Sequence, residues 1–277
     1  MLYQTLKNGE KLPLLGLGTY LTSGDETYNS VRWAIELGYT LIDTAQIYKN
    51  EDIVGKAIKD SGKCRTDLYV VTKVNFKNYR RCYESVLQSM KDLKTDYLDL
   101  VLLHWPYNDY YAAWREIETL YKEGVIRSIG VSNFEPDRLI DLINFNEIVP
   151  LVDQIETNLL CQRFEDEKWL KKYGVAHMAY TPLGQNRRNE MFDFKPVCEL
   201  SEKYKKSKAQ IMLRYLIERG ITAIPKSVHK QRLAENIDIF DFSLTKEEML
   251  ALSSLDTATP LVGTPSDPER VVRSINW

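Results

Sequence analysis

Short apolar runs alternate along the chain with longer segments in which apolar residues recur every three or four positions. The apolar runs, which predict strands, are residues 14–20, 40–44, 68–74, 97–105, 126–131, 151–156, 175–180 and 221–225. The segments with helical spacing are residues 25–37, 51–59, 79–93, 111–121, 136–143, 164–172, 196–219 and 230–236. Strands that read as continuous Val, Ile and Leu runs are typical of parallel sheets covered on both faces. The pattern therefore predicts an α/β protein with a (β/α)8 TIM barrel.

Segments at both ends of the chain fall outside this alternation. Residues 3–12 predict a β-hairpin that turns at Asn8-Gly9, and we expect it to form a cap. Residues 245–255 predict a further helix, which Thr245 and Glu248 would open as a capping box. The tail, residues 256–277, is rich in Pro, Gly and Ser and is expected to be an ordered C-terminal flap near the site. Because no linker divides the chain, residues 1–277 are expected to form one domain.

Composition narrows the classes of partner. The 277 residues carry 37 Lys and Arg against 39 Asp and Glu, a net charge of -2, so nothing global favours nucleic acid or an anionic membrane surface. No apolar run approaches the roughly 20 residues of a membrane span, and no signal peptide is visible. The four cysteines include no CxxC pair, and the three histidines are not spaced as ligands near a cysteine. We therefore expect a cytoplasmic protein, a monomer, without a metal site.

Ionisable residues stand at the ends of three consecutive predicted strands. Asp43 ends the second strand, with Tyr48 in the following loop, Lys73 ends the third and His104 the fourth. Each alone has an ordinary explanation: a turn cap, a packed ring, a solvated lysine or a histidine near the core. Together they would face one mouth of a barrel, because the loops after the strands converge there. An ammonium beside a phenol is expected to lower the phenol pKa from about 10, giving a proton donor near neutral pH.

Three further motifs accompany this set and carry a family resemblance. They are Gly130-Val131-Ser132-Asn133-Phe134, Gln154-Ile155-Glu156 and Ile224-Pro225-Lys226-Ser227-Val228. With the four residues above, the chain resembles the aldo-keto reductase superfamily from the hairpin to about residue 256. Its length and the short loop after the fourth strand are most like the small prokaryotic members grouped with 2,5-diketo-gluconate reductases.

The resemblance implies a reversible, NAD(P)H-dependent reduction of an aldehyde or ketone to an alcohol. Tyr48 matches the general acid of that family, Lys73 and Asp43 the pair that tunes it, and His104 the residue that orients the carbonyl oxygen. Negative charge develops on that oxygen as hydride arrives, and hydrogen bonds from Tyr48 and His104 would stabilise it.

Contacts with the cofactor also follow from the resemblance. In the nicotinamide and pyrophosphate half the implied residues are Gly18, Thr19, Tyr20, Asp43, Ser132, Asn133, Gln154, Tyr180, Thr181, Leu183 and Gln185. In the adenosine half they are Lys226, Ser227, Val228, Arg232, Glu235 and Asn236. Two cations and a hydroxyl (Lys226, Arg232 and Ser227) suit a 2′-phosphate, so NADPH is expected, with NADH as a weaker alternative. The other interpretation is a solvated helix start in which Lys230 and Arg232 are surface charges.

The substrate pocket is expected to form beside the proton donor. Its wall would include Tyr20, Ile47, Tyr48, His104 and Trp105, together with Tyr107 and the C-terminal flap. Such a pocket suits small aldehydes, dicarbonyls such as methylglyoxal, or keto-sugar derivatives, and the sequence does not choose among them.

Some alternatives stay open. A cofactor-binding regulatory subunit, or a barrel hydrolase or isomerase that binds a phosphorylated metabolite through Lys226 and Ser227, would share much of this pattern. The absence of GxGxxG disfavours a Rossmann dehydrogenase. The pair Arg187-Arg188 is either a solvated loop, a clamp on the cofactor pyrophosphate, or an attraction for an acidic substrate.

Overall fold

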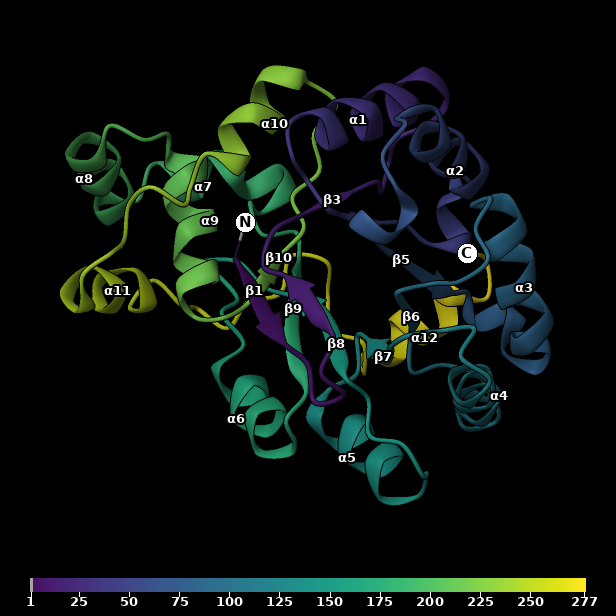
Figure 1. Cartoon of the computed structure of the whole chain (residues 1–277). Coiled ribbons are helices and arrows are strands. Elements are labelled where there is room, and N and C mark those ends of the chain that lie inside the picture. Colours follow the sequence, from purple (N-terminus) through teal and green to yellow (C-terminus); the bar gives the residue numbers. More distant parts are fainter. Residues whose placement is uncertain (1) are drawn as a thin grey trace.

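A closed sheet of parallel strands forms the centre of the computed structural model, which describes residues 2–277 (Figure 1). In chain order its eight strands are β3 (Gly16–Gly18), β4 (Leu41–Asp43), β5 (Tyr69–Val74), β6 (Leu100–Leu103), β7 (Ile129–Ser132), β8 (Val152–Glu156), β9 (Ala176–Tyr180) and β10 (Thr222–Ala223). The amide of Ala223 donates to the Leu14 carbonyl at 2.9 Å and that of Gly18 to the Pro225 carbonyl at 3.1 Å. These bonds join the first strand to the last, and the predicted (β/α)8 barrel is confirmed.

A glycine permits this closure. A Cβ atom on Gly18 would lie 2.8 Å from the carbonyl oxygen of Ile224, closer than real Cβ contacts. Any larger residue would push the first strand away from the last, which is why β3 ends in glycine at the pocket side.

Amphipathic helices surround the barrel because their apolar faces cover the outer side chains of the strands (Figure 1). Those that follow the eight strands are α1 (Gly24–Glu36), α2 (Glu51–Asp60), α3 (Cys82–Asp92), α4 (Tyr110–Lys122), α5 (Pro136–Asn144), α6 (Phe164–Tyr173), α9 (Lys208–Glu218) and α10 (Lys230–Ile237). Additional helices and turns are η1 (Gln46–Tyr48), η2 (Arg65–Asp67), η3 (Phe76–Arg81), η4 (Gln185–Arg187), α7 (Arg188–Phe192), α8 (Lys195–Tyr204), α11 (Lys246–Ser253) and α12 (Pro268–Ser274). No helix among the described residues has the length and apolar character to span a bilayer.

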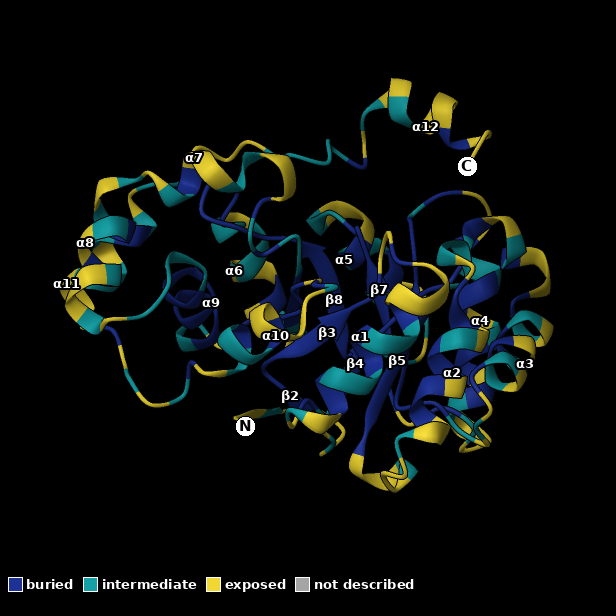
Figure 2. Ribbon diagram, turned by 90° about the horizontal axis from the view of Figure 1, so that it is seen from above, coloured by how far each residue is buried: buried dark blue, intermediate teal, exposed yellow. Residues whose placement is uncertain are grey.

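The hairpin closes one end of the barrel. Strands β1 (Tyr3–Thr5) and β2 (Lys11–Pro13) pair antiparallel, as predicted. Leu6 and Leu12 are buried in one cluster with inward-facing strand residues such as Leu41. This cap covers the end at which the strands begin, while α12 lies over the end at which they finish (Figure 2).

One predicted helix is wrong in its extent. The segment 196–219 is two helices, α8 and α9, because Lys205 adopts a left-handed backbone with φ of 53° and ends the first. Ser207 then opens the second with a capping box to Gln210. Residues 79–93 also differ, since they begin in the tight turn η3 and become α-helical only at Cys82.

The C-terminal tail is an ordered flap over the mouth of the barrel. Helix α11 starts with the predicted capping box of Thr245 and Glu248. Beyond it, the Glu156 carboxylate at the end of β8 accepts hydrogen bonds from the amides of Leu261 at 2.6 Å and Val262 at 2.9 Å. At the chain end, the Trp277 ring packs against Trp105 with centroids 5.4 Å apart. These contacts fix the tail across the pocket.

Candidate active site

A cavity of about 1340 Å³ opens at the carboxyl ends of the strands. Its lining includes all but three of the predicted site residues, namely Gly18, Tyr20, Asp43, Ile47, Tyr48, His104, Trp105, Ser132, Asn133, Gln154, Tyr180, Thr181, Leu183, Gln185, Lys226, Ser227, Val228, Arg232, Glu235 and Asn236. The other three are Tyr107, described below, and Thr19 and Lys73, which are buried behind the wall. Thr19 donates its hydroxyl hydrogen to the Asp43 carbonyl at 2.9 Å and so supports the end of β4.

Asp43, Lys73 and Tyr48 meet at one end of this cavity. The fully buried Lys73 Nζ lies 2.5 Å from Asp43 Oδ1 and 3.4 Å from the Tyr48 hydroxyl, and it also donates to the Thr44 carbonyl at 2.8 Å. Strands β4 and β5 are neighbours in the sheet, which places the two charged side chains together. Burial raises the pKa of the Asp43 carboxyl and lowers that of the Lys73 ammonium, and the opposite charge of each partner counteracts both shifts.

We expected Lys73 to lower the pKa of the Tyr48 hydroxyl, and this expectation is wrong for the protein without ligands. Burial raises the pKa of the Tyr48 hydroxyl well above its usual value, and the negative charge of Asp43 raises it further. The Lys73 ammonium, 3.4 Å from the hydroxyl, does not reverse this shift, because burial is its largest cause. Tyr48 therefore keeps its proton throughout the physiological pH range and remains a hydrogen-bond donor.

His104 follows strand β6 and completes the group. Its ring meets the Tyr48 ring edge to face, with centroids 5.8 Å apart. Burial, with a smaller contribution from the Lys73 cation, lowers the pKa of His104 well below 6.5, so the imidazole is neutral. Its Nδ1 atom is buried and has no hydrogen-bond partner within residues 2–277. A neutral imidazole carries one N–H, which suits hydrogen bonding to an oxygen in the pocket.

Two side chains that the sequence did not single out hold the loop of Tyr48. Gln46 accepts hydrogen bonds from the Asn75 amide and the Asn78 side chain, both at 2.9 Å, which ties η1 to the segment after β5. Asn50 is buried, donates to the Thr19 carbonyl at 3.1 Å and accepts from the Thr44 hydroxyl at 2.7 Å. A polar residue in a turn is a weak sequence signal, since only the folded contacts show what it supports.

Amide and hydroxyl groups continue the site along the next strands. Gln154 donates its amide to Asp43 Oδ2 at 2.8 Å, which satisfies the second carboxylate oxygen. Asn133 has a left-handed backbone with φ of 64° and donates to the His104 carbonyl at 2.9 Å. The Tyr180 hydroxyl donates to Asn133 Oδ1 at 2.6 Å. This connected network fixes polar groups around a space beside Tyr48.

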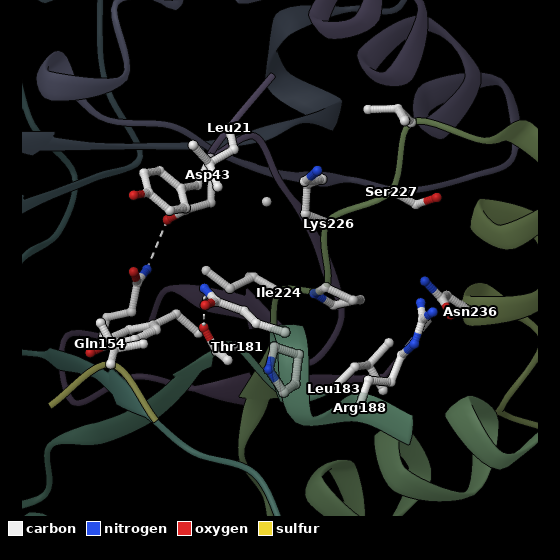
Figure 3. A pocket seen from close by; sticks show the side chains of 18 of the residues that line it. Leu21, Asp43, Gln154, Thr181, Leu183, Arg188, Ile224, Lys226, Ser227 and Asn236 are labelled. Carbon is white, nitrogen blue, oxygen red and sulfur yellow. Dashed lines mark hydrogen bonds between the residues drawn. The ribbon is translucent and has the colours of Figure 1, made fainter. Parts of the chain in front are cut away.

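The far end of the cavity is cationic. Lys226 and Arg232 line it and form no ion pair within residues 2–277, whereas the neighbouring Lys230 binds Glu36 on the surface at 2.8 Å. Lys230 is thus a paired surface charge, whereas Lys226 and Arg232 are exposed cations without a partner there, so both interpretations of Arg232 stay open. The Ser227 hydroxyl accepts from the His229 amide at 3.1 Å and faces the same space (Figure 3).

Some lining residues were not identified from the sequence. Val262, Arg270 and Trp277 come from the tail, and the Arg270 guanidinium lies 4.6 Å from the centroid of Trp105 and 5.1 Å from that of Trp277. The sequence indicated an ordered flap but could not show which side chains face inward. Tyr107, expected in the wall, instead lies beneath the flap and donates to the Pro265 carbonyl at 2.9 Å.

The cavity fits a dinucleotide phosphate together with a small substrate. Its volume exceeds the roughly 300–1,000 Å³ of single small-molecule sites. Neutral amide, hydroxyl and ring groups surround one end, as a nicotinamide requires, and unpaired cations surround the other, as a phosphate requires. Within residues 2–277 no group of three or more His, Cys, Asp or Glu side chains is placed to hold a metal ion.

Comparison with known proteins agrees with this architecture. The Aldo/keto reductase family matches residues 14–257, and the chain belongs to that family. It is 39% identical to the methylglyoxal reductase DkgA of Escherichia coli (strain K12), over 94% of this chain and 95% of the relative, and 42% identical to the glyoxal reductase of Bacillus subtilis (strain 168), over 91% of each. These relatives support the predicted resemblance to small prokaryotic members.

Solved structures show the same fold. An aldo-keto reductase from a Medee basin deep-sea metagenome library superimposes with a TM-score of 0.93 at 37% identity, covering 95% of this chain and 98% of that one. The Bombyx mori aldo-keto reductase in complex with NADP superimposes with a TM-score of 0.89 at 35% identity, covering 94% of each chain. The chain is therefore an aldo-keto reductase with a barrel fold.

Proposed function

We propose that this protein reduces aldehyde or ketone groups of small molecules to alcohols with NADPH, and that Tyr48 is the general acid. The observation that carries the proposal is the group of Lys73, Asp43 and Tyr48, with Lys73 Nζ 2.5 Å from the carboxylate and 3.4 Å from the phenol. In this group the two charges pair with each other, whereas Lys226 and Arg232, which line the same cavity, have no ion-pair partner within residues 2–277. This arrangement supports a carbonyl beside Tyr48, a nicotinamide next to it and a phosphate near Lys226 and Arg232.

The side chains around Tyr48 act on the carbonyl oxygen. NADPH, when bound, supplies the hydride that reduces the carbonyl carbon. Tyr48 and the neutral His104 donate hydrogen bonds to the oxygen as it becomes negative, and Tyr48 then transfers its proton to it. Lys73 stabilises the phenolate left behind, because its ammonium is held beside the hydroxyl by Asp43. Gln154 keeps Asp43 in position by donating a hydrogen bond to Oδ2, the carboxylate oxygen that Lys73 does not contact.

Ser132, Asn133 and Gln154 would hold the nicotinamide carboxamide, and Tyr180 would contact the ring face. Gly18 and Tyr20 border the same space, while Thr181, Leu183 and Gln185 border the path to the adenosine end. There, Glu235 and Asn236 would receive the adenine, and Lys226, Ser227 and Arg232 the 2′-phosphate.

The preference for NADPH over NADH has a direct test in Arg232→Ala. We expect this change to raise the Kd for NADPH about tenfold or more, because it removes a charge-assisted contact to the 2′-phosphate. The Kd for NADH should change by less than about twofold. Isothermal titration with both cofactors measures the two values. Equal losses for the two cofactors would contradict the assignment of Arg232 to the 2′-phosphate.

The pocket wall suits small substrates. Tyr20, Ile47 and Trp105 enclose the space in front of Tyr48 and His104, and Trp277 closes it from the tail. The names of two relatives, a methylglyoxal reductase and a glyoxal reductase, add weight to dicarbonyl compounds as substrates. Keto-sugar derivatives remain the second class to test.

A carbonyl-substrate panel with NADPH and NADH tests the proposal as a whole. We expect NADPH oxidation, followed by its absorbance, with small aldehydes and dicarbonyls. Bound NADPH that stays reduced with every carbonyl would favour a regulatory subunit. A hydrolase or isomerase for phosphorylated metabolites would instead show no rise in melting temperature with NADPH, whereas a cofactor that binds the folded state must raise it.

We further propose that residues 1–277 act as one domain, as a monomer, in the cytoplasm. None of the four cysteines forms a disulfide, which fits a reducing compartment. Light scattering should give a mass near 32.2 kDa, and twice that mass would contradict the monomer.

A further inference from the structure

The two consecutive arginines of the segment after β9 have different surroundings. Arg187 is bound to Glu190 through both carboxylate oxygens, at 2.6 Å and 2.5 Å, and is a solvent-exposed ion pair. Arg188 forms no ion pair within residues 2–277 and lines the cavity. Its Nε atom is buried and has no hydrogen-bond partner in that part of the chain. The side chain as a whole is only half-buried and lines the cavity, so its cationic group can meet an anion there.

The segment that carries Arg188 is held in place. Gly184 has φ of 72°, and a Cβ on it would lie 1.6 Å from the Met191 side chain, so only glycine allows this close packing. Met191 itself is completely buried and anchors α7. The Arg187 amide donates to the Gly184 carbonyl at 2.8 Å. Arg188 therefore projects from an anchored turn, and its guanidinium group is positioned before any ligand arrives.

Arg188 faces the adenosine end of the cavity from the wall opposite Lys226. Figure 3 shows its side chain rising beside Leu183 and extending toward Asn236, while Lys226 and Ser227 lie across the space. The ring centroid of Phe192, from the same short helix, lies 5.6 Å from the guanidinium carbon of Arg188, and the ring supports that group. Glu235 also lines this end, but it makes no ion pair with Arg188. The cation thus remains available to an anion in the cavity.

We propose that Arg188 is a further cofactor-binding residue, which contacts a phosphate of the adenosine half of NADPH from the wall opposite Lys226. This inference rests on the proposed function, because it takes the cavity to be a dinucleotide site. Both the 2′-phosphate and the pyrophosphate offer the oxygen atoms that a guanidinium group binds with paired N–H donors. Of the three interpretations of Arg187-Arg188, a solvated loop fits Arg187 and a phosphate clamp fits Arg188.

Calorimetric titration of the full-length protein tests this assignment without depending on turnover. The ligands are NADPH, NADH and adenosine 2′,5′-bisphosphate, and the variants are Arg188→Gln and, as a second form that keeps the aliphatic stem, Arg188→Met. We expect each variant to raise the Kd for NADPH about tenfold, since one charged contact is lost. Arg187→Gln is the matched control, one residue away. Its Kd for NADPH should stay within about twofold of the unchanged protein, because Arg187 forms an ion pair with Glu190 at the surface.

The pattern of losses identifies the phosphate. A loss shared by NADPH and NADH indicates the pyrophosphate, and a loss confined to NADPH and the bisphosphate indicates the 2′-phosphate; both support the proposal. The loss should also shrink at high salt, as a charge contact in an open pocket does. An unchanged Kd in both Arg188 variants, or a loss equal to that of Arg187→Gln, would overturn it. Failure of the unchanged protein to bind either dinucleotide would instead refute the proposed function.

Discussion

Replacing Tyr48 with phenylalanine is expected to lower kcat/KM for carbonyl reduction by at least about 10³-fold. The substitution removes only the hydroxyl, which is the proposed proton donor and one of two hydrogen bonds to the carbonyl oxygen. The ring and its contacts with Tyr20 and His104 remain, so the Kd for NADPH should stay within about twofold. Steady-state kinetics and a fluorescence titration measure the two quantities.

Tyr39→Phe is the control for loss of a buried tyrosine hydroxyl. Tyr39 donates to the Leu233 carbonyl at 2.9 Å and does not line the cavity. The Tyr39→Phe substitution should lower the free energy of unfolding slightly and leave kcat/KM nearly unchanged. Loss of NADPH binding in Tyr48→Phe would show that Tyr48 maintains the pocket, and retained activity would show that another group supplies the proton.

A second large effect is expected on stability from Lys73→Met. The change leaves the Asp43 carboxylate almost fully buried without its cation, and breaking a buried pair in this way costs about 3–5 kcal/mol of the free energy of unfolding. The double variant Asp43→Asn with Lys73→Met should recover much of that loss, because no unpaired charge remains. Neither variant should reduce carbonyls at an appreciable rate, since the phenolate loses its cation in both.

The pH dependence of Lys73→Met follows from the same burial. Desolvation already raises the pKa of Asp43, and removal of Lys73 takes away the charge that opposes this shift. The folded variant then binds a proton more tightly than the unfolded chain, whose Asp pKa is about 3.9. Its stability should therefore fall as pH rises from about 4 through the folded-state pKa. Denaturant unfolding at several pH values measures this.

Lys122→Met provides the matched control for stability. Lys122 and Glu147 form an ion pair 2.6 Å apart, with side chains 49% and 70% exposed. An exposed pair contributes at most about 1 kcal/mol, so this variant should unfold close to the unchanged protein at all pH values. If Lys73→Met also unfolded close to the unchanged protein at all pH values, the buried pair of Lys73 and Asp43 would not contribute the stability expected of it.

Much of the site could be predicted because the barrel turns a linear pattern into a spatial one. Asp43, Lys73 and His104 lie at the ends of consecutive strands, and parallel pairing brings such ends to one mouth. Their proximity can therefore be predicted from the sequence, even though they are 30 or more positions apart in the chain. The raised pKa of Tyr48 was not accessible in this way, because it depends first on how deeply the fold buries the hydroxyl and then on how close Asp43 lies.

Other features depend on contacts that no local pattern encodes. The break at Lys205 requires a left-handed backbone in a residue that usually favours helices, and only the capping pair of Ser207 and Gln210 signals it. Arg187 and Arg188 are indistinguishable in sequence, and their separate roles appear only once Glu190 is placed beside the first. Arg270 and Trp277 reach the pocket through a tail whose path is set by Glu156.

The path of that tail has a practical consequence for redesign. Asp43, Tyr48, Lys73 and His104 all lie within residues 14–257, the part of the chain that matches the family, whereas Val262, Arg270 and Trp277 follow it. Part of the pocket wall is thus supplied by a segment outside the closed barrel. Exchanging residues 258–277 for the tail of another reductase should alter which carbonyl compounds are accepted, while the barrel retains its fold and its chemistry. Substrate choice and folding can then be engineered as separate modules of one chain.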